Sequence, residues 1–157
     1  MLKWLWLSLL TLVLDQGSKL YIDGSMQLYQ SIPLMPHFSL TYVHNTGAAF
    51  SFLSEAGGWQ RWFFAGLALV MSIGITFWLA RLQKHETLLA VALSLVLGGA
   101  IGNLIDRLAY GYVIDFLDVY YGTWHWPAFN IADSAITVGV MLMLAESFGL
   151  GNSTPKD

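Results

Sequence analysis

Four long apolar segments constrain this chain more than any other feature of its sequence. They cover approximately residues 3–21, 59–80, 87–108 and 131–150. Each is close to the length of about 20 residues that a helix needs to cross the hydrocarbon core of a bilayer. Only 11% of the residues are charged and 56% are hydrophobic, whereas about a quarter of the residues of a soluble protein are charged. The sequence therefore predicts a single integral membrane domain over residues 1–157, with an all-α transmembrane core of four helices.

The first apolar segment has a second interpretation, as a cleavable secretory signal. Lys3 would then be its basic flank, and residues 4–14 would be its apolar core. However, no small-residue cleavage site follows, and the sequence DQGSK continues the helical pattern. We therefore expect this segment to be the first membrane-spanning helix.

The positions of the basic residues predict the orientation of the four spans. An even number of spans places both termini on one side, and cytoplasmic segments are enriched in Lys and Arg. Basic residues occur near the termini and in the short turn after the second span, namely Lys3, Arg81, Lys84 and Lys156. The termini and this turn are therefore expected to be cytoplasmic, and residues 22–58 and 109–130 to be extracytoplasmic.

The two extracytoplasmic segments lack the periodicity of helices. Between Phe38 and Tyr42, apolar residues alternate with Ser39 and Thr41, which is typical of a strand. The sequence HNTGAAFSF is expected to form a turn followed by another apolar stretch. Aromatic residues, which favour the headgroup layer, crowd the second segment: Tyr120, Tyr121, Trp124, Trp126 and Phe129. We predict a small extracytoplasmic β-sheet and an extracytoplasmic loop at the membrane surface, and a disordered tail over residues 151–157.

Polar residues inside the first and third spans follow helical spacing. Asp15 and Lys19 are four residues apart, as in an ion pair on one face of a helix. The third span has two neighbouring rows at four-residue spacing: Ser94, Gly98, Gly102 and Asp106 form one, and Gly99, Asn103 and Arg107 form the other. The glycines are expected to allow close helix packing. Asn103, Asp106 and Arg107 lie near the outer interface, where they could orient other polar groups, although Arg107 could instead extend to the headgroups.

Two aspartates, Asp115 and Asp133, are predicted to meet near the outer membrane surface. Asp115 lies just beyond the third span, and Asp133 lies just inside the fourth, so an antiparallel helix pair brings them to a similar depth. Two carboxylates in a semi-apolar site hold one proton tightly between them, so that one serves as a base and the other as an acid. The alternative for Asp133 is a helix start, with Asn130 as the N-cap residue. Asp118 is expected to be solvated.

The residue inventory makes several other chemistries unfavourable. The chain has no cysteine and no H-E-x-x-H sequence, and its four histidines lack the spacing of metal ligands. Ser134 has no visible base with an orienting partner. Lys and Arg are too few and too scattered for nucleic-acid binding. Acid–base catalysis by the two aspartates, with no metal or other cofactor, is the chemistry that the residues favour.

Five sequence blocks resemble lipoprotein signal peptidase, also called signal peptidase II, a family of bacterial intramembrane aspartic peptidases. The blocks are LDQGSK (14–19), NTGAAFSF (45–52), GGAIGNLIDR (98–107), GYVIDF (111–116) and FNIADS (129–134). They occur in order, with compatible spacing, over about residues 12–139.

The resemblance implies the activity, the substrate and the site. It implies that Asp115 and Asp133 are the catalytic dyad, and that the substrate is a prolipoprotein with diacylglyceryl on its cysteine, cleaved just before that cysteine. It also implies that seven further residues line or support the site: Asp15, Lys19, Asn45, Gly47, Asn103, Arg107 and Asn130. The expected location is the bacterial cytoplasmic (inner) membrane, with the site near the extracytoplasmic face, in contact with membrane lipid. We expect a monomer.

Two other functions are compatible with buried polar residues in four spans. A small proton-coupled transporter would use acidic residues to relay protons, but both key aspartates lie near one face of the membrane. A non-catalytic assembly factor would use Gly98 and Gly102 to pair with another helix.

The dyad mechanism predicts that a metal chelator leaves the peptidase activity unchanged, because the two aspartates supply both proton transfers. The measurement is cleavage of a lipidated prolipoprotein by the purified enzyme before and after treatment with EDTA. Loss of activity that zinc restores would contradict the mechanism.

Overall fold

The computed structural model describes residues 1–47 and 57–149. A short 3₁₀ turn, Leu2–Trp4, leads into α1 (Leu5–Ser25). The other three helices are α2 (Trp59–Arg81), α3 (Thr87–Ala109) and α4 (Ile131–Ser147). They coincide with the four apolar segments, except that α1 continues further, through Ser25. The sequence DQGSK is helical, as expected. The turn and apolar stretch expected in HNTGAAFSF, residues 44–52, lie outside the described residues from residue 48 onward. The tail expected to be disordered, residues 151–157, also lies outside them.

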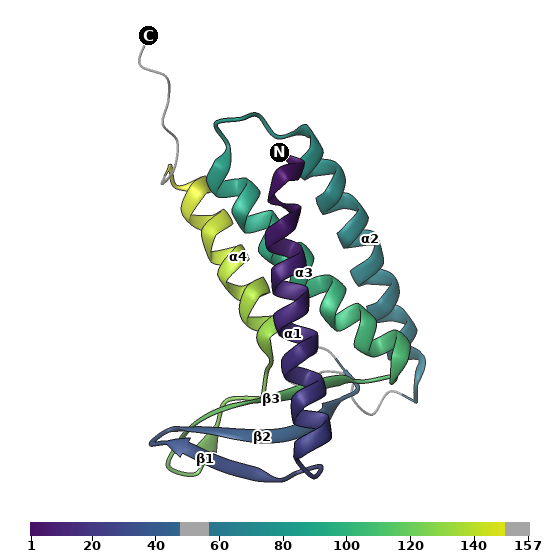
Figure 1. The fold of residues 1–157 in the computed structure, drawn as a ribbon, viewed down its shortest axis with the longest axis vertical. Helices are drawn as coiled ribbons and strands as arrows, with labels where there is room; N and C mark the ends of the chain where they lie inside the picture. Colours follow the sequence, from purple (N-terminus) through teal and green to yellow (C-terminus); the bar gives the residue numbers. More distant parts are fainter. Residues whose placement is uncertain (48–56, 150–157) are drawn as a thin grey trace.

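A small antiparallel sheet lies across one end of the helices (Figure 1). Its strands are β1 (Ser31–Met35), β2 (Phe38–Asn45), β3 (Val113–Tyr121) and β4 (Trp124–His125), and they pair in that order. The predicted combination of four helices and a small sheet is therefore confirmed. The long pairing of β2 with β3 joins the segment after α1 to the segment after α3.

The alternating residues predicted to form a strand lie in β2, and the buried positions of this strand include a polar residue. Ser39 and Tyr42 are buried, whereas Phe38 and Leu40 are only partly buried. Ser39 and Thr41 donate hydrogen bonds to Asp118 Oδ2 at 3.0 and 2.9 Å. The expectation that Asp118 is solvated is therefore wrong, because hydroxyl groups of the paired strand replace water around its carboxylate.

Helix α3 packs against each of the other three helices. Its glycine rows allow the close approach to α1 and α4, because a β-carbon at each of these glycines would collide with one of those two helices. At Gly98 the β-carbon would lie 2.7 Å from the backbone oxygen of Ser8 in α1. At Gly99 it would meet the backbone oxygen of Ala132 in α4. At Gly102 it would meet the carboxylate of Asp15 in α1. The predicted packing role of these glycines is confirmed.

Among the helices of residues 1–47 and 57–149, two are long and apolar enough to cross a membrane by length and composition alone. They are α2, with mean hydropathy 2.1, and α3, with mean hydropathy 2.2. Helix α3 is the more buried of the two because it lies among the other helices, whereas α2 packs mainly against α3. The N-terminus, the C-terminal end of α4 and the α2–α3 turn lie at the end of the bundle opposite the sheet (Figure 1).

We predict that Gly99→Ala destabilises the protein by about 1–3 kcal/mol, the usual effect of overpacking. The collision is with backbone, which cannot move aside easily. Gly74→Ala is the matched control, because Gly74 lies in α2 with no atom within 4 Å of the added β-carbon. Alanine there should be neutral or stabilising by up to about 1 kcal/mol, through its higher helix propensity. Thermal unfolding of both variants in detergent measures the difference, and equal stability would contradict the packing role.

Candidate active site

The start of α4 holds Asp133 in a fixed position. Asn130 is the N-cap residue, and its side-chain oxygen accepts a hydrogen bond from the Asp133 backbone N–H at 2.9 Å. In return, the Asn130 backbone N–H donates to Asp133 Oδ2 at 3.3 Å. This reciprocal capping box satisfies two N–H groups that a helix start otherwise leaves unpaired. The predicted capping role of Asn130 is confirmed.

Asp115 reaches the same region from the sheet. It lies in β3 and is only 2% exposed. Asn45, in the neighbouring strand β2, donates to Asp115 Oδ2 at 3.0 Å, and Asn130 donates to Asp115 Oδ1 at 2.7 Å. Both carboxylate oxygens are therefore held by side-chain amides.

A pair of asparagines bridges the two aspartates. Asn103 of α3 donates to Asp133 Oδ1 at 2.8 Å, and its own side-chain oxygen accepts from Asn130 Nδ2 at 3.3 Å. The same Asn130 nitrogen binds Asp115. A continuous chain of hydrogen bonds therefore runs from one carboxylate to the other, and it fixes their relative placement.

Arg107 and Gly47 lie at the edge of this network. Arg107 donates to the backbone oxygen of Gly47 at 2.9 Å and to that of Asn103 at 3.2 Å. The Gly47 N–H in turn donates to Asn45 Oδ1 at 3.0 Å, which orients the Asn45 amide. Arg107 therefore does more than extend to the membrane surface, because it ties the end of β2 to α3.

Asp15 and Lys19 lie on the inner side of the same network. Lys19 forms ion pairs of 2.8 Å with both Asp15 and Asp106, and it donates to Asn103 Oδ1 at 3.0 Å. All three charged side chains are almost completely buried. The predicted pairing of Asp15 with Lys19 is confirmed, and Asp106 is a second partner that spacing alone does not reveal.

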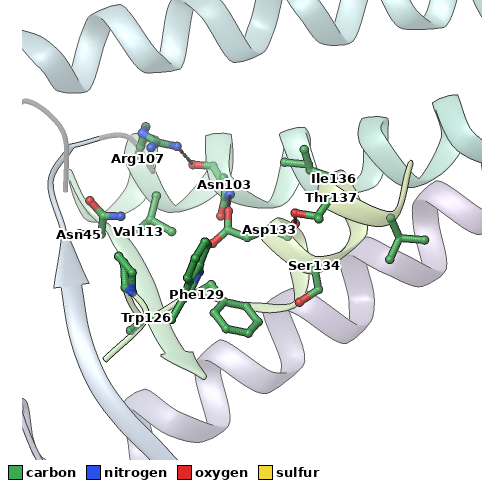
Figure 2. Close-up of a pocket in the computed structure, with 13 residues that line it drawn as sticks. Asn45, Asn103, Arg107, Val113, Trp126, Phe129, Asp133, Ser134, Ile136 and Thr137 are labelled. Carbon is green, nitrogen blue, oxygen red and sulfur yellow. Dashed lines mark hydrogen bonds between the residues drawn. The ribbon is translucent and has the colours of Figure 1, made fainter. Parts of the chain in front are cut away.

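A pocket of about 530 Å³ opens beside Asp133. Figure 2 shows Asn103 and Asp133 together in the middle of its lining, with Arg107 and Asn45 towards one end. Most of the remaining lining is apolar or weakly polar: Val113, Trp126, Pro127, Ala128, Phe129, Ser134, Ile136, Thr137 and Val138. A mainly apolar pocket with a few convergent polar groups is the usual form of a binding site.

The nine site residues predicted from the sequence all lie in this region. They belong to one connected hydrogen-bond network, which contains the two aspartates of the predicted dyad, the side chains of three asparagines and Arg107, Gly47 and the Asp15–Lys19 pair. Trp126 and Phe129 of the pocket wall were expected only as interfacial aromatics. Gln16, which donates to both Asp15 and Asp106, was not expected, because a single glutamine in a helix gives no pattern. Among residues 1–47 and 57–149, no group of three or more His, Asp or Glu residues is arranged to hold a metal ion.

The environment of Asp115 favours its protonated form. The pKa of Asp115 is raised to about 7, first by burial and second by the negative charge of Asp133. Hydrogen bonds from Asn45 and Asn130 and the positive charge of Lys19 lower this pKa and offset part of the increase. A carboxyl group that keeps its proton near neutral pH can act as a general acid. Asp133 is partly exposed at the pocket, beside the positive end of the α4 dipole. The two carboxyl groups therefore have different environments, which suits an acid and a base.

The raised pKa of Asp115 predicts how stability depends on pH. The folded chain binds this proton more tightly than the unfolded chain, in which an aspartate ionises near pH 4, so stability falls as pH rises from about 4 to about 7. Asp115→Asn removes the titrating group, so the variant should lose less stability between pH 5 and pH 8, by on the order of a few kcal/mol. Thermal unfolding at the two pH values measures this, with Glu146→Gln at the other end of α4 as a control. An equal loss in wild type and Asp115→Asn would contradict the prediction.

Comparisons with known proteins agree with this geometry. The family described as Signal peptidase (SPase) II matches residues 7–149. A lipoprotein signal peptidase from Alteromonas mediterranea is 53% identical over 156 residues, covering 99% of this chain and 86% of that protein. One from Pseudoalteromonas translucida is 56% identical over 156 residues, covering 99% and 93%. A solved bacterial membrane enzyme, determined by the in meso method, is 29% identical and superposes with a TM-score of 0.86, covering 99% of this chain and 93% of its own. The chain therefore belongs to the signal peptidase II family of aspartic peptidases.

Proposed function

We propose that Asp115 and Asp133 are the catalytic dyad with which this signal peptidase removes the signal peptide from a prolipoprotein. The observation that carries the proposal is the asparagine bridge, in which Asn130 binds Asp115 and also caps α4 by accepting a hydrogen bond from the backbone N–H of Asp133, the third residue of that helix. Two carboxyl groups held this way are fixed relative to each other before substrate binds. Such preorganisation is what general acid–base catalysis requires.

The different environments of the aspartates support a first role for each in the mechanism that we propose. Asp133, ionised at the start of α4, takes a proton from a water molecule as that water attacks the scissile carbonyl. Asp115 donates its proton to the carbonyl oxygen. When the C–N bond of the tetrahedral intermediate breaks, Asp133 gives the proton taken from water to the leaving amine, and a hydroxyl group of the intermediate returns a proton to Asp115, which restores both aspartates. Asn45, Asn103 and Asn130 hold the carboxylates in place. The dyad supplies each proton transfer, so the mechanism uses no cofactor.

The pocket beside Asp133 supports a lipid-bearing substrate. Its lining is mainly apolar, and Trp126 and Phe129 contribute aromatic surface next to the catalytic groups. An acyl chain or an apolar signal helix gains free energy by leaving water for such a surface. We assign this pocket to the prolipoprotein segment around the diacylglyceryl-modified cysteine, with cleavage just before that cysteine.

The arrangement of the helices supports a defined orientation in the bacterial cytoplasmic membrane. The N-terminus, the C-terminal end of α4 and the basic α2–α3 turn lie at one end of the bundle, and the sheet and the start of α4 lie at the other (Figure 1). Positively charged segments favour the cytoplasmic side. We therefore place the termini in the cytoplasm, all four helices across the membrane and the dyad near the extracytoplasmic face. We propose that the protein acts as a monomer.

Family membership favours the peptidase over the transporter and the assembly factor. The acidic residues that would relay protons gather around the dyad: Asp15, Asp106, Asp115 and Asp133 belong to one network with Lys19 and the asparagines. In addition, Gly98 and Gly102 are already covered by α1, so they are not free to pair with another protein.

The decisive experiment compares Asp115→Asn and Asp133→Asn with wild type, using lipidated and unlipidated prolipoprotein. Each variant should lose activity by at least about a hundredfold, since general acid–base catalysis contributes about 10²–10⁴-fold. Unlipidated substrate should be cleaved poorly by every form. Asp118→Asn is the matched control, because Asp118 is also a buried carboxylate of β3 but binds Ser39, Thr41 and His125 instead. Normal cleavage by folded Asp133→Asn protein would overturn the dyad.

A further inference from the structure

The residues directly before the two aspartates are anchored in the same way. The backbone N–H of Ala132, which precedes Asp133, donates to Asp15 Oδ1 at 2.9 Å. The backbone N–H of Ile114, which precedes Asp115, donates to Asp106 Oδ2 at 3.1 Å. Each aspartate of the proposed dyad is therefore one residue away from a backbone group held by a buried carboxylate on another helix.

These two anchoring carboxylates share one ammonium group. Lys19 Nζ lies 2.8 Å from Asp15 Oδ2 and 2.8 Å from Asp106 Oδ2. Gln16 makes a second link, donating to Asp15 Oδ2 at 3.1 Å and to Asp106 Oδ1 at 2.9 Å. Asp15, Lys19 and Asp106 have relative exposures of 0%, 1% and 1%, so solvent does not weaken these interactions. The two backbone anchors are thus joined through Lys19.

Lys19 is also connected to the dyad through its third partner. It donates to Asn103 Oδ1, and the amide nitrogen of Asn103 donates to Asp133 Oδ1. The charged and titratable groups around Lys19 and the dyad are Asp15 from α1, Asp106 and Arg107 from α3, Asp115 from β3 and Asp133 from α4. These groups come from four different elements, so their relative positions depend on how those elements pack together.

We propose that Asp15, Lys19 and Asp106 act as a positioning clamp that sets the separation of Asp115 and Asp133 and biases their charge. The clamp reaches Asp133 through the N–H of Ala132 and reaches Asp115 through the N–H of Ile114. Two carboxylates and one ammonium leave the clamp with one net negative charge. This inference rests on the proposed dyad, because the clamp acts only through Asp115 and Asp133.

The clamp predicts effects of opposite sign for its acidic and basic members. Asp15→Asn and Asp106→Asn keep an oxygen that can accept the backbone hydrogen bond, but each removes a negative charge near the dyad. Ionisation of the dyad then becomes easier, so the pH profile of kcat should shift to lower pH by about half to one unit. Lys19→Met removes a positive charge and should shift the profile to higher pH by a similar amount.

The kinetic constants separate positioning from substrate binding. Each clamp variant should lower kcat at least about tenfold, because small displacements of reacting groups are costly. KM should stay within about twofold, since none of the three side chains lines the pocket. Asp118→Asn, a buried carboxylate of β3 outside the clamp, should change neither kcat nor the pH profile.

The experiment measures kcat, KM and the pH profile of purified variants in detergent with lipidated prolipoprotein. If Lys19→Met does not fold, the triple variant Asp15→Asn/Lys19→Met/Asp106→Asn replaces it, because removing a buried ion set together avoids unpaired charge. The triple variant should have a lower kcat and a profile shifted to lower pH, since it loses the net negative charge.

Two results would overturn the clamp: wild-type kcat in folded Asp106→Asn and Asp15→Asn proteins, or activity lost only in proportion to the folded fraction with no shift of the pH profile. Asp115→Asn and Asp133→Asn are assayed in parallel. If these two are inactive while the clamp variants behave as wild type, the clamp fails and the dyad stands; if these two are active, the dyad itself fails.

Discussion

The burial of the Lys19 ammonium group between Asp15 and Asp106 is the interaction on which the rest of the site depends. An unpaired ion in an apolar interior is strongly unfavourable, so each of these three groups requires the others to be in place. The two carboxylates also accept hydrogen bonds from backbone N–H groups near the start of α4 and of β3. Helices α1 and α3 therefore cannot pack together without also fixing the two segments that carry Asp133 and Asp115.

The glycines of α3 make this arrangement possible. The added β-carbon at Gly102 would occupy the space of the Asp15 carboxylate, and at Gly99 it would meet the backbone just before Asp133. The absence of a side chain at these glycines therefore allows both the close approach of the helices and the burial of the ions between them. The polar residues lie where α1, α3, α4 and the sheet converge, beside a pocket with a mainly apolar lining. This combination suits a peptidase that brings a water molecule to a lipid-bearing substrate.

Much of the fold could be predicted from the sequence, because bilayer-length apolar runs have few alternatives. The helices begin and end within a few residues of the predicted segments. The i, i+4 pairing of Asp15 with Lys19 and the capping by Asn130 are local, so spacing was sufficient to find them. Asp118 was misjudged because its partners, Ser39 and Thr41, are about eighty residues away in the sequence, on another strand. Asp106 was recognised only as a polar residue near the interface, since its partners lie on α1 and β3.

By itself the sequence determined the four helices, the small sheet, the end of the molecule at which polar residues gather and the two aspartates that are candidates for catalysis. Length, periodicity and local capping predict the helices and strands, because each depends on neighbours within a few residues. The two aspartates also required the order of the spans and the resemblance to a known family. Only the tertiary structure decided that Asn103 and Asn130 bridge the aspartates, that Lys19 joins two carboxylates and that Asp115 lies buried while Asp133 faces the pocket. These features depend on hydrogen bonds between segments far apart in the chain, whose relative positions follow from helix and strand packing.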